Sequence, residues 1–355
     1  MTSIEPLRDV PLAGFCTMGV GGAARYFLEA RRERDLEEAV EWAGRRKVAL
    51  RVLGGGSNLV VADDGVDGLV VRIALRGTAS SVRGEAVELT AAAGEPWDDL
   101  VRTAVEQGWA GLECLSGIPG LVGATPIQNV GAYGQEVSDT IASVRGLDRE
   151  TGRIATLTPP ECRFGYRTSA LKSGAGARYI VLAVSYRLVR GGRPATHYED
   201  VVTDLERAGV RSPSLEDVRR SVLRIRRSKS MVVEAGDPNR RSCGSFFLNP
   251  VVTAERLRAI EERVGRSVAM PRWPDREGRI KLSAAWLIER AGFQRGHREG
   301  NAGLSSRHAL AIVCHEGARA EDVIALARRV RDAVHERFGV RLEPEPVFWG
   351  SLALD

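Results

Sequence analysis

The sequence lacks the features of membrane-spanning and exported proteins. None of its apolar runs approaches the ~18 residues of a membrane span, and the longest, 179–184, has the length of a strand. The first thirty residues contain Glu5, Asp9 and Glu29 and have no apolar core segment, so we expect no signal peptide. These absences predict a cytoplasmic protein that does not engage a membrane.

Cysteine and histidine are too few and too scattered to form a recognisable framework. The five cysteines are odd in number and contain no C-x-x-C pair, which argues against both a disulfide scaffold and a structural zinc site. The five histidines are dispersed and form no H-E-x-x-H pattern. We therefore expect no metal.

Lysine is also scarce, because Lys47, Lys172, Lys229 and Lys281 are the only lysines. Arginine supplies nearly all of the positive charge behind the formal net charge of +5. Acidic residues are interspersed throughout, and no basic run alternates with aromatic residues. The charge pattern therefore does not favour a nucleic-acid partner.

Hydrophobic periodicity predicts a mixture of strands and helices in a chain long enough for two or three domains. The expected strands are 48–53, 59–61, 69–73, 86–93, 143–147, 154–157, 179–188, 309–314 and 340–342. The expected helices are 34–43 stopping at Gly44, one with Pro96 at its first position and Gly108 past its end, 214–229 with a capping box at Ser214 and Asp217, 253–264, 283–291, and 321–338 with its apolar residues on one face. Strands and helices occur in blocks more than in alternation, so the class is α+β.

Two glycine-rich segments could bind a nucleotide. Gly19–Ala24 satisfies the G-x-G-x-x-A expression, but it follows a poor strand and no strand-end acid comes about twenty residues later, so it is interpreted as a turn. The segment GGGSN, 54–58, lies between two expected strands, where backbone N–H groups could converge on an anion. It is not a P-loop, and an ordinary glycine-rich turn remains an alternative.

A second punctuated stretch, 116–133, places several glycines and prolines close together. Its polar side chains include Thr125, Gln128 and Asn129. A backbone of this kind suits close wrapping around a flat cofactor.

The stretch CGSFF places Ser245 between a glycine and two phenylalanines. Three interpretations are open: a hydrolase nucleophile, a proton-transfer residue, or a small polar residue in a buried strand. The local pattern favours the buried strand. The hydrolase interpretation fails, because the motif is not G-x-S-x-G and no histidine lies in a context that suggests a base.

The motifs together resemble a known family. LGGGSN and SGIPGLVGATPIQNVGAYG, followed by CRFGYRTS at 162–169, CGSFFLNP at 243–250 and LEPEPVFWG at 342–350, are similar to UDP-N-acetylenolpyruvoylglucosamine reductases, and the opening 15–27 is similar to the family's first turn. The resemblance implies two α+β FAD-binding subdomains of non-Rossmann type, with a strand–loop–strand pyrophosphate loop, and a C-terminal α+β substrate domain. The implied domains are 1–75, 76–230 and 231–345, with 346–355 able to return to the first.

The resemblance also implies a cofactor, a reaction and a set of binding residues. The family holds FAD non-covalently, takes NADPH as co-substrate and reduces UDP-N-acetylglucosamine-enolpyruvate to UDP-N-acetylmuramate in peptidoglycan precursor synthesis; we expect a monomer. The implied FAD-binding residues are Gly54, Gly55, Gly56, Ser57, Asn58, Leu59, Ile118, Pro119, Gly123, Ala124, Thr125, Gln128 and Asn129.

Three residues match the family's catalytic positions. Arg167 would bind the substrate carboxylate as charge develops on it, and Ser245 would donate a proton to C2. Glu345, whose backbone is restricted by Pro344 and Pro346, matches the third position. The implied substrate-binding residues are Tyr198, Lys229 and Asn249, and the block around Tyr198 implies the longer, type I form of the enzyme.

Two other functions remain open from the residues. An FAD-dependent oxidase or dehydrogenase of another substrate would use the same fold, although the set Arg167, Ser245 and Glu345 would then have no clear role. A non-catalytic flavin- or nucleotide-binding protein would need only the two loops.

Overall fold

The fold combines α-helices with strands, many of which are rich in valine, leucine and isoleucine. The computed structural model describes residues 4–265 and 268–354, and the chain divides into two units. The first unit contains the described part of Met1–Val10 together with Ala24–Gly55 and Asp67–Val233. The second contains Pro11–Ala23, Gly56–Val66 and the described part of Glu234–Asp355.

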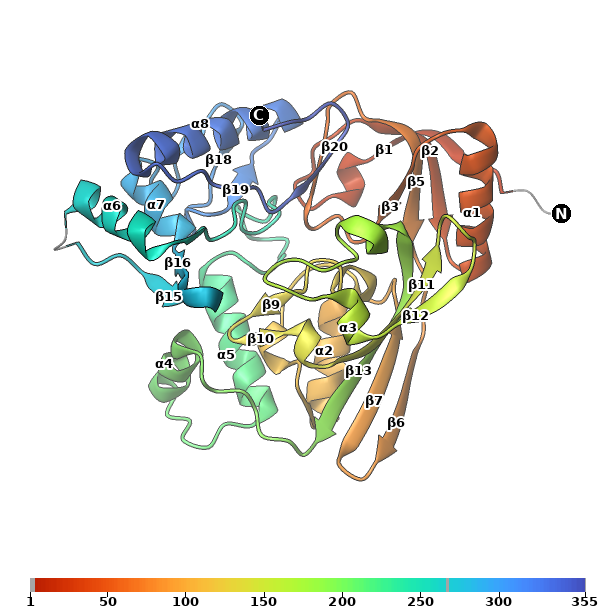
Figure 1. Ribbon diagram of the computed structural model, residues 1–355, viewed down its shortest axis with the longest axis horizontal. Helices are drawn as coiled ribbons and strands as arrows, with labels where there is room; N and C mark the ends of the chain where they lie inside the picture. The colour runs from red at the N-terminus through yellow and green to blue at the C-terminus, as the bar shows by residue number, and fades with distance from the viewer. Residues whose placement is uncertain (1–3, 266–267, 355) are drawn as a thin grey trace. The chain divides into compact units, whose positions relative to one another are not determined.

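A four-stranded sheet opens the first unit, in the order β1-β2-β5-β3 (Figure 1). Its strands are β1 (Leu7–Pro11), β2 (Ala23–Ala30), β3 (Leu50–Leu53) and β5 (Val66–Ile73). Helix α1 (Glu33–Arg46) connects β2 to β3, and β3 pairs with β5 in parallel. The buried face of α1 includes Leu36, Ala39 and Trp42. This helix therefore covers apolar surface that the sheet would otherwise expose.

A larger antiparallel sheet follows in the order β12-β11-β13-β7-β6, with β8 also paired to β13. Its strands are β6 (Thr78–Arg83), β7 (Ala86–Ala92), β8 (Trp109–Ala110), β11 (Ile141–Asp148), β12 (Ile154–Leu157) and β13 (Tyr179–Arg190). One hydrophobic core contains residues from both sheets, with Tyr26 and Leu69 from the first and Val144 and Tyr186 from the second. Arg145 on β11 also forms a two-point ion pair with Glu33 of α1. The two sheets are therefore parts of one packed unit.

The remaining helices of the first unit position its loops. They are α2 (Trp97–Glu106), α3 (Pro159–Cys162), α4 (Glu199–Arg207) and α5 (Leu215–Ser228). A short antiparallel pair, β9 (Gly131–Ala132) and β10 (Gln135–Glu136), lies between α2 and α3 in the sequence. The expected cap of α5 is confirmed: Asp217 N donates to Ser214 Oγ at 3.2 Å, and Ser214 N donates to the Asp217 carboxylate at 2.9 Å. Reciprocal capping fixes where this helix begins.

The second unit is built around α8 (Ala320–Phe338). Its other elements are β4 (Leu59–Val61), β14 (Val251–Val252), α6 (Ala254–Val264), β15 (Arg272–Pro274), β16 (Ile280–Leu282), α7 (Ala284–Arg290), β17 (Arg298–Glu299), β18 (Ala302–Leu304), β19 (Ile312–Cys314) and β20 (Val347–Trp349). Asp63 caps α8 by accepting hydrogen bonds from Ala320 N at 2.9 Å and Glu321 N at 3.1 Å. Strand β20 pairs with β4 in parallel, so the end of the chain joins a strand from near its beginning.

The predicted α+β class is confirmed, but two predictions of element bounds were wrong and one strand was missed. Helix α1 continues past Gly44 and ends where Lys47 takes φ +54°, because a left-handed residue, not the first available glycine, ends it. Residues 340–342 form no strand, and the last strand is β20. Strand β6 was missed because all six of its residues are exposed and give no apolar pattern. The division into three domains stays a prediction.

Val330, on α8, is completely buried, so shortening it should destabilise the second unit. We expect Val330→Ala to lower the free energy of unfolding by about 2 kcal/mol, from lost apolar burial and a residual cavity. Val347→Ala removes the same atoms from a residue that is 48% exposed, and should cost less than about 1 kcal/mol. Urea unfolding of both variants measures the difference; equal losses would contradict the packing of α8.

Candidate active site

Two glycine-rich loops of the first unit approach each other through their backbones. A Cβ at Gly55 would lie 2.9 Å from the Cα of Gly120, closer than real Cβ contacts. At Gly54 the nearest atom would be the Cβ of Ala124, at an ordinary 3.8 Å. Packing therefore requires glycine at 55, whereas Gly54 leaves its backbone open to an approaching group.

The same glycine loop continues into the second unit with a different constraint. Gly56 has φ +62°, and a Cβ there would lie 1.9 Å from the carbonyl oxygen of Phe15. Its own carbonyl accepts a hydrogen bond from Thr17 N at 3.1 Å. Ser57 and Asn58 then lead into β4. Both the positive φ and the close approach of the Phe15 carbonyl thus require glycine at position 56.

The second loop is fastened to the start of α2. Trp97 Nε1 donates to the carbonyl of Leu115 at 3.1 Å, and Trp97 N donates to the carbonyl of Gly120 at 3.0 Å. Gly123 N donates to Ala93 O at 2.9 Å, and a Cβ at Gly123 would lie 2.5 Å from that of Ala93. The segment that includes Ile118 and Pro119 is therefore held at both ends.

Thr125 is buried and faces the protein. Its hydroxyl donates to Val122 O at 2.8 Å and lies 3.0 Å from the hydroxyl of Tyr186. Burial raises the pKa of Tyr186 well above its usual range, so that hydroxyl stays protonated. These contacts make the Thr125 side chain a support of the loop.

Asn129 and Arg167 form one linked arrangement in the first unit. Asn129 is buried with φ +45°, and its amide donates to Glu136 Oε2 at 2.8 Å and to Gly165 O at 3.1 Å. Arg167 donates to Asn129 O at 3.4 Å and to Gly131 O. Arg167 also has φ +52°, inside a tight turn closed by the pairing of Gly165 with Thr168. A non-glycine residue in this conformation is held there by its surroundings.

Tyr198 and Lys229 are brought together with Tyr133 near the end of α5. The rings of Tyr133 and Tyr198 meet edge to face with centroids 5.4 Å apart. Lys229 Nζ forms an ion pair with Asp200 at 2.9 Å. Burial raises the pKa of both tyrosines, so the cluster presents neutral hydroxyls beside a lysine.

Ser245 and Glu345 lie on neighbouring segments of the second unit. Glu345 N donates to Phe246 O at 2.9 Å, and Phe247 bridges to Pro344. Phe246 and Phe247 are both buried, with ring centroids 5.2 Å apart, while Ser245 is half-buried. The side chains of Ser245 and Glu345 thus extend from two segments that hold each other in place through backbone contacts.

The expectation that Ser245 lies in a regular strand was wrong. Its segment pairs through single bridges, at Ser242 with Val313 and at Phe247 with Pro344. Gly244 has φ +76°, which interrupts the extended backbone immediately before Ser245. The two phenylalanines still anchor the segment, because both rings are buried in the core of this unit.

Two asparagines of the predicted site also make structural contacts in the second unit. Asn58 Nδ2 donates to the carbonyl of Glu345 at 3.2 Å, which ties the glycine loop to the Glu345 segment. Asn249 Oδ1 accepts from Ala284 N at 3.0 Å, at the start of α7. The chain thus places Asn58, Ser245 and Glu345 in one unit, whereas Arg167, Tyr198 and Lys229 belong to the other.

Sequence reasoning missed two buried arginines of α5, Arg219 and Arg226. Arg226 is only 6% exposed and donates to Met231 O at 2.6 Å; burial lowers its pKa. Both arginines occur among buried apolar residues of the helix, with Val218, Val222 and Ile225. Arginine at positions of an apolar helix face is the signal that could have identified them.

Two negative findings apply to the described part of the chain, residues 4–265 and 268–354. None of its helices combines the length and apolar character that crossing a bilayer requires. No group of three or more histidine, cysteine or acidic side chains there could hold a metal ion.

Comparison with protein families matches two segments of the chain. Residues 24–158 match an FAD binding domain, and residues 237–349 match the C-terminal domain of UDP-N-acetylenolpyruvoylglucosamine reductase. The second match contains Ser245, Asn249 and Glu345.

Individual relatives agree along nearly the whole chain. The UDP-N-acetylenolpyruvoylglucosamine reductase of Saccharopolyspora erythraea is 48% identical over 351 residues, covering 97% of this chain and 95% of the relative. That of Mycobacterium tuberculosis is 43% identical, with the same coverage of 97% and 95%. The crystal structure of the Thermus caldophilus enzyme of that name is 29% identical, covers 98% of this chain and 99% of its own, and has a TM-score of 0.65.

The two glycines of the first loop should respond differently to a methyl group. We expect Gly56→Ala to lower the free energy of unfolding by at least about 2 kcal/mol, because of positive φ and the clash with Phe15. Gly54→Ala, with its nearest neighbour at 3.8 Å, should change it by less than about 1 kcal/mol. Thermal or urea unfolding tests both. A Gly56→Ala protein as stable as the unmodified chain would refute the close approach.

Proposed function

The chain belongs to the UDP-N-acetylenolpyruvoylglucosamine reductase family of FAD oxidoreductases, and from that premise we propose that it reduces UDP-N-acetylglucosamine-enolpyruvate to UDP-N-acetylmuramate with NADPH, in peptidoglycan precursor synthesis. The observation that best supports this proposal is the pairing of the Ser245 segment with the Glu345 segment, where Glu345 N donates to Phe246 O at 2.9 Å. Both segments lie within the residues that match the family's C-terminal domain.

The residues of the two loops suit FAD. Gly55 and Gly120 bring the two loops into close backbone contact, and the backbone at Gly54 stays open, so that backbone N–H groups there could bind a pyrophosphate. Ser57, Asn58, Leu59, Ile118, Pro119, Gly123, Ala124, Thr125, Gln128 and Asn129 complete the proposed binding set. A bound FAD would supply the hydride chemistry that links NADPH to the methylene carbon of the enolpyruvyl group.

Arg167 is proposed to hold the substrate carboxylate. Hydride addition drives negative charge toward that carboxylate, and a guanidinium, which stays protonated, can stabilise it with two parallel hydrogen bonds. Its backbone conformation and its bonds to the carbonyls of Asn129 and Gly131 support a fixed orientation. Pre-orientation of this kind avoids the cost of organising the charge during the reaction.

Ser245 is proposed to donate the proton that C2 requires. A serine hydroxyl is a weak acid, but a carbanion or enolate beside it is a strong base, so transfer needs chiefly a fixed geometry. Burial of Phe246 and Phe247 directly after Ser245 supports such a geometry. Glu345 is proposed as the third catalytic residue, with its backbone pinned to Phe246 and to Asn58.

Tyr198, Lys229 and Asn249 are proposed to bind the nucleotide part of the substrate. Lys229 supplies a positive charge near Tyr198, whose ring contacts that of Tyr133, and this charge suits a diphosphate. Its present partner, Asp200, would have to yield part of this interaction to the phosphate oxygens. Asn249 already uses Oδ1 to cap Ala284, which leaves its amide nitrogen as the donor for a ligand.

A direct assay separates this function from the alternatives. The purified protein with FAD should oxidise NADPH only when the enolpyruvyl sugar nucleotide is added, and should form one UDP-N-acetylmuramate per NADPH. An oxidase or dehydrogenase of another substrate would fail to turn over this compound. A non-catalytic flavin-binding protein would bind FAD and show no turnover with it.

Replacing Ser245 should separate the two halves of the reaction. In Ser245→Ala we expect NADPH to reduce the flavin at a normal rate, while reoxidation by the sugar nucleotide slows by about 10²- to 10⁴-fold, because the proton donor is lost. Anaerobic stopped-flow absorbance measures both steps, and FAD affinity and unfolding are measured alongside.

The matched control is Ser242→Ala, three residues earlier, where the hydroxyl accepts a hydrogen bond from Gly244 N at 3.4 Å. It should leave both half-reactions within about threefold of the unmodified rates. If Ser245→Ala slowed flavin reduction and reoxidation equally, Ser245 would be a structural residue.

Replacing Lys229 should weaken substrate binding alone. We expect Lys229→Met to raise the KM for the sugar nucleotide by about tenfold or more, through loss of a charge-assisted contact to phosphate, with FAD affinity unchanged. Lys47→Met, at the end of α1, provides a control with the same change in charge. Steady-state kinetics measures the effect, and an unchanged KM in Lys229→Met would remove Lys229 from the binding set.

A further inference from the structure

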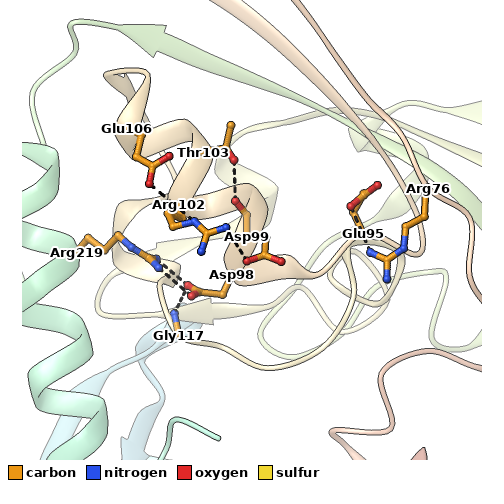
Figure 2. A network of polar contacts seen from close by, with 9 residues as sticks. All are labelled: Arg76, Glu95, Asp98, Asp99, Arg102, Thr103, Glu106, Gly117 and Arg219. Carbon is orange, nitrogen blue, oxygen red and sulfur yellow. Dashed lines mark hydrogen bonds and ion pairs between the residues drawn. The ribbon is translucent and has the colours of Figure 1, made fainter. Parts of the chain in front are cut away.

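Asp98, the second residue of α2, joins three separate parts of the first unit. Its carboxylate accepts two hydrogen bonds from Arg219 of α5, from Nη1 to Oδ1 at 2.7 Å and from Nη2 to Oδ2 at 2.8 Å. Oδ1 also accepts from Gly117 N, in the second glycine-rich loop, at 2.6 Å (Figure 2). One side chain thus connects the start of α2, the loop and α5.

The Asp98–Arg219 pair is not an ordinary surface ion pair. The Arg219 side chain is 9% exposed and sits in the buried face of α5, whereas the Asp98 side chain is 38% exposed. A buried guanidinium without its carboxylate would be an uncompensated charge, so this contact is costly to break. Burial alone would raise the pKa of Asp98, but the bonds from Arg219 and Gly117 outweigh it and lower that pKa. The carboxylate is therefore charged at neutral pH.

Gly117 is held between Asp98 and α5. It has φ +71°, and a Cβ at this position would lie 2.7 Å from Leu223 Cδ2 and 3.4 Å from Arg226 Nε. The backbone of the loop at Gly117 consequently packs against side chains of α5. Asp98 fixes the only hydrogen-bond donor that Gly117 has.

The three connected parts serve both proposed binding regions. Ile118 and Pro119 follow Gly117 directly and belong to the proposed FAD set, while Lys229 of the proposed substrate set is the C-cap residue of α5. A shift of the loop against α5 would move one region relative to the other. The bidentate geometry of Arg219 and the third bond from Gly117 oppose that shift.

We propose that Asp98 is a positioning residue that holds the 116–120 loop against α5. It thereby fixes the proposed FAD-binding residues Ile118 and Pro119 relative to Lys229 of the proposed substrate set. The inference rests on the proposed function for the identity of the two ligands. Asp98 itself touches neither reacting group and acts through Gly117 and Arg219.

A simpler role for Asp98 is stabilisation of α2 by negative charge in its first turn. Asp99 offers a control for that role, because it occupies the same turn and carries the same charge. Asp99 pairs with Arg102 of its own helix at 3.0 Å, and both side chains are about half exposed (53% and 54%) (Figure 2). Neutralising Asp99 removes the same charge from the first turn of the helix but leaves the hydrogen bonds of Asp98 with Arg219 and Gly117 intact.

The experiment compares Asp98→Asn with Asp99→Asn in the full-length protein. FAD is titrated into the apoprotein by flavin fluorescence, well below the unfolding temperature of each variant, and KM and kcat are measured at saturating FAD. We expect Asp98→Asn to weaken FAD binding about tenfold and to raise the KM for the sugar nucleotide, with a smaller change in kcat. Asp99→Asn should match the unmodified protein in its affinity for FAD and in its KM for the sugar nucleotide.

Two further variants make the result decisive. Arg219→Lys keeps the charge but cannot bridge both carboxylate oxygens, so it should weaken FAD binding in the same direction, and it replaces Asp98→Asn in the comparison should that variant fail to fold. The double variant Asp98→Asn with Arg219→Lys should be no worse than the worse single variant.

Equal FAD affinities in Asp98→Asn and Asp99→Asn would overturn the proposal, as would fully additive effects of the Asp98 and Arg219 changes. The FAD titration tests the role of Asp98 even if the unmodified protein does not turn over the sugar nucleotide. A lack of turnover would count against the proposed function alone.

Discussion

Close approach of backbone at glycine positions is the constraint on which the proposed cofactor region depends. Gly55 meets the backbone of Gly120 and Gly123 meets Ala93 at distances that leave no space for a Cβ, and a Cβ at Gly117 would collide with the side chain of Leu223. Backbone packed this closely presents its N–H groups in fixed positions, which is what a bound anion requires. The hydrogen bonds of Trp97 and Asp98 then hold the loop in place, so the start of α2 supports the site without belonging to it.

In the second unit the corresponding constraint is the pairing of two segments far apart in sequence. Residues 246–248 and 343–345 are joined by backbone hydrogen bonds, and the side chain of Asn58, from the glycine loop, donates to the carbonyl of Glu345. Phe246 is fully buried, and its ring centroid lies 6.3 Å from that of Phe348, which is partly buried against the same core. Ser245 and Glu345 therefore sit on chain whose position is determined by the core, which suits residues that must act with fixed geometry.

Regular elements with strong patterns could be predicted from the sequence, and irregular ones could not. The capping box at Ser214 and the apolar face of α8 gave their helices correctly, because capping and periodicity are local signals. The break before Ser245 depends on Gly244 at φ +76°, which an extended apolar pattern does not reveal. The motifs of the proposed site could be recognised in the sequence as separate segments. The hydrogen bonds of Asp98 with Gly117 and Arg219 join residues up to 121 positions apart, and they become visible only in the folded structure.

The most direct test of the proposed chemistry is a crystal structure of the protein with FAD and UDP-N-acetylglucosamine-enolpyruvate. The hydroxyl of Ser245 should lie within about 3.5 Å of C2 of the enolpyruvyl group, and the guanidinium of Arg167 should contact its carboxylate. A bound substrate whose C2 is remote from Ser245, with Arg167 turned away from the carboxylate, would contradict the assigned roles.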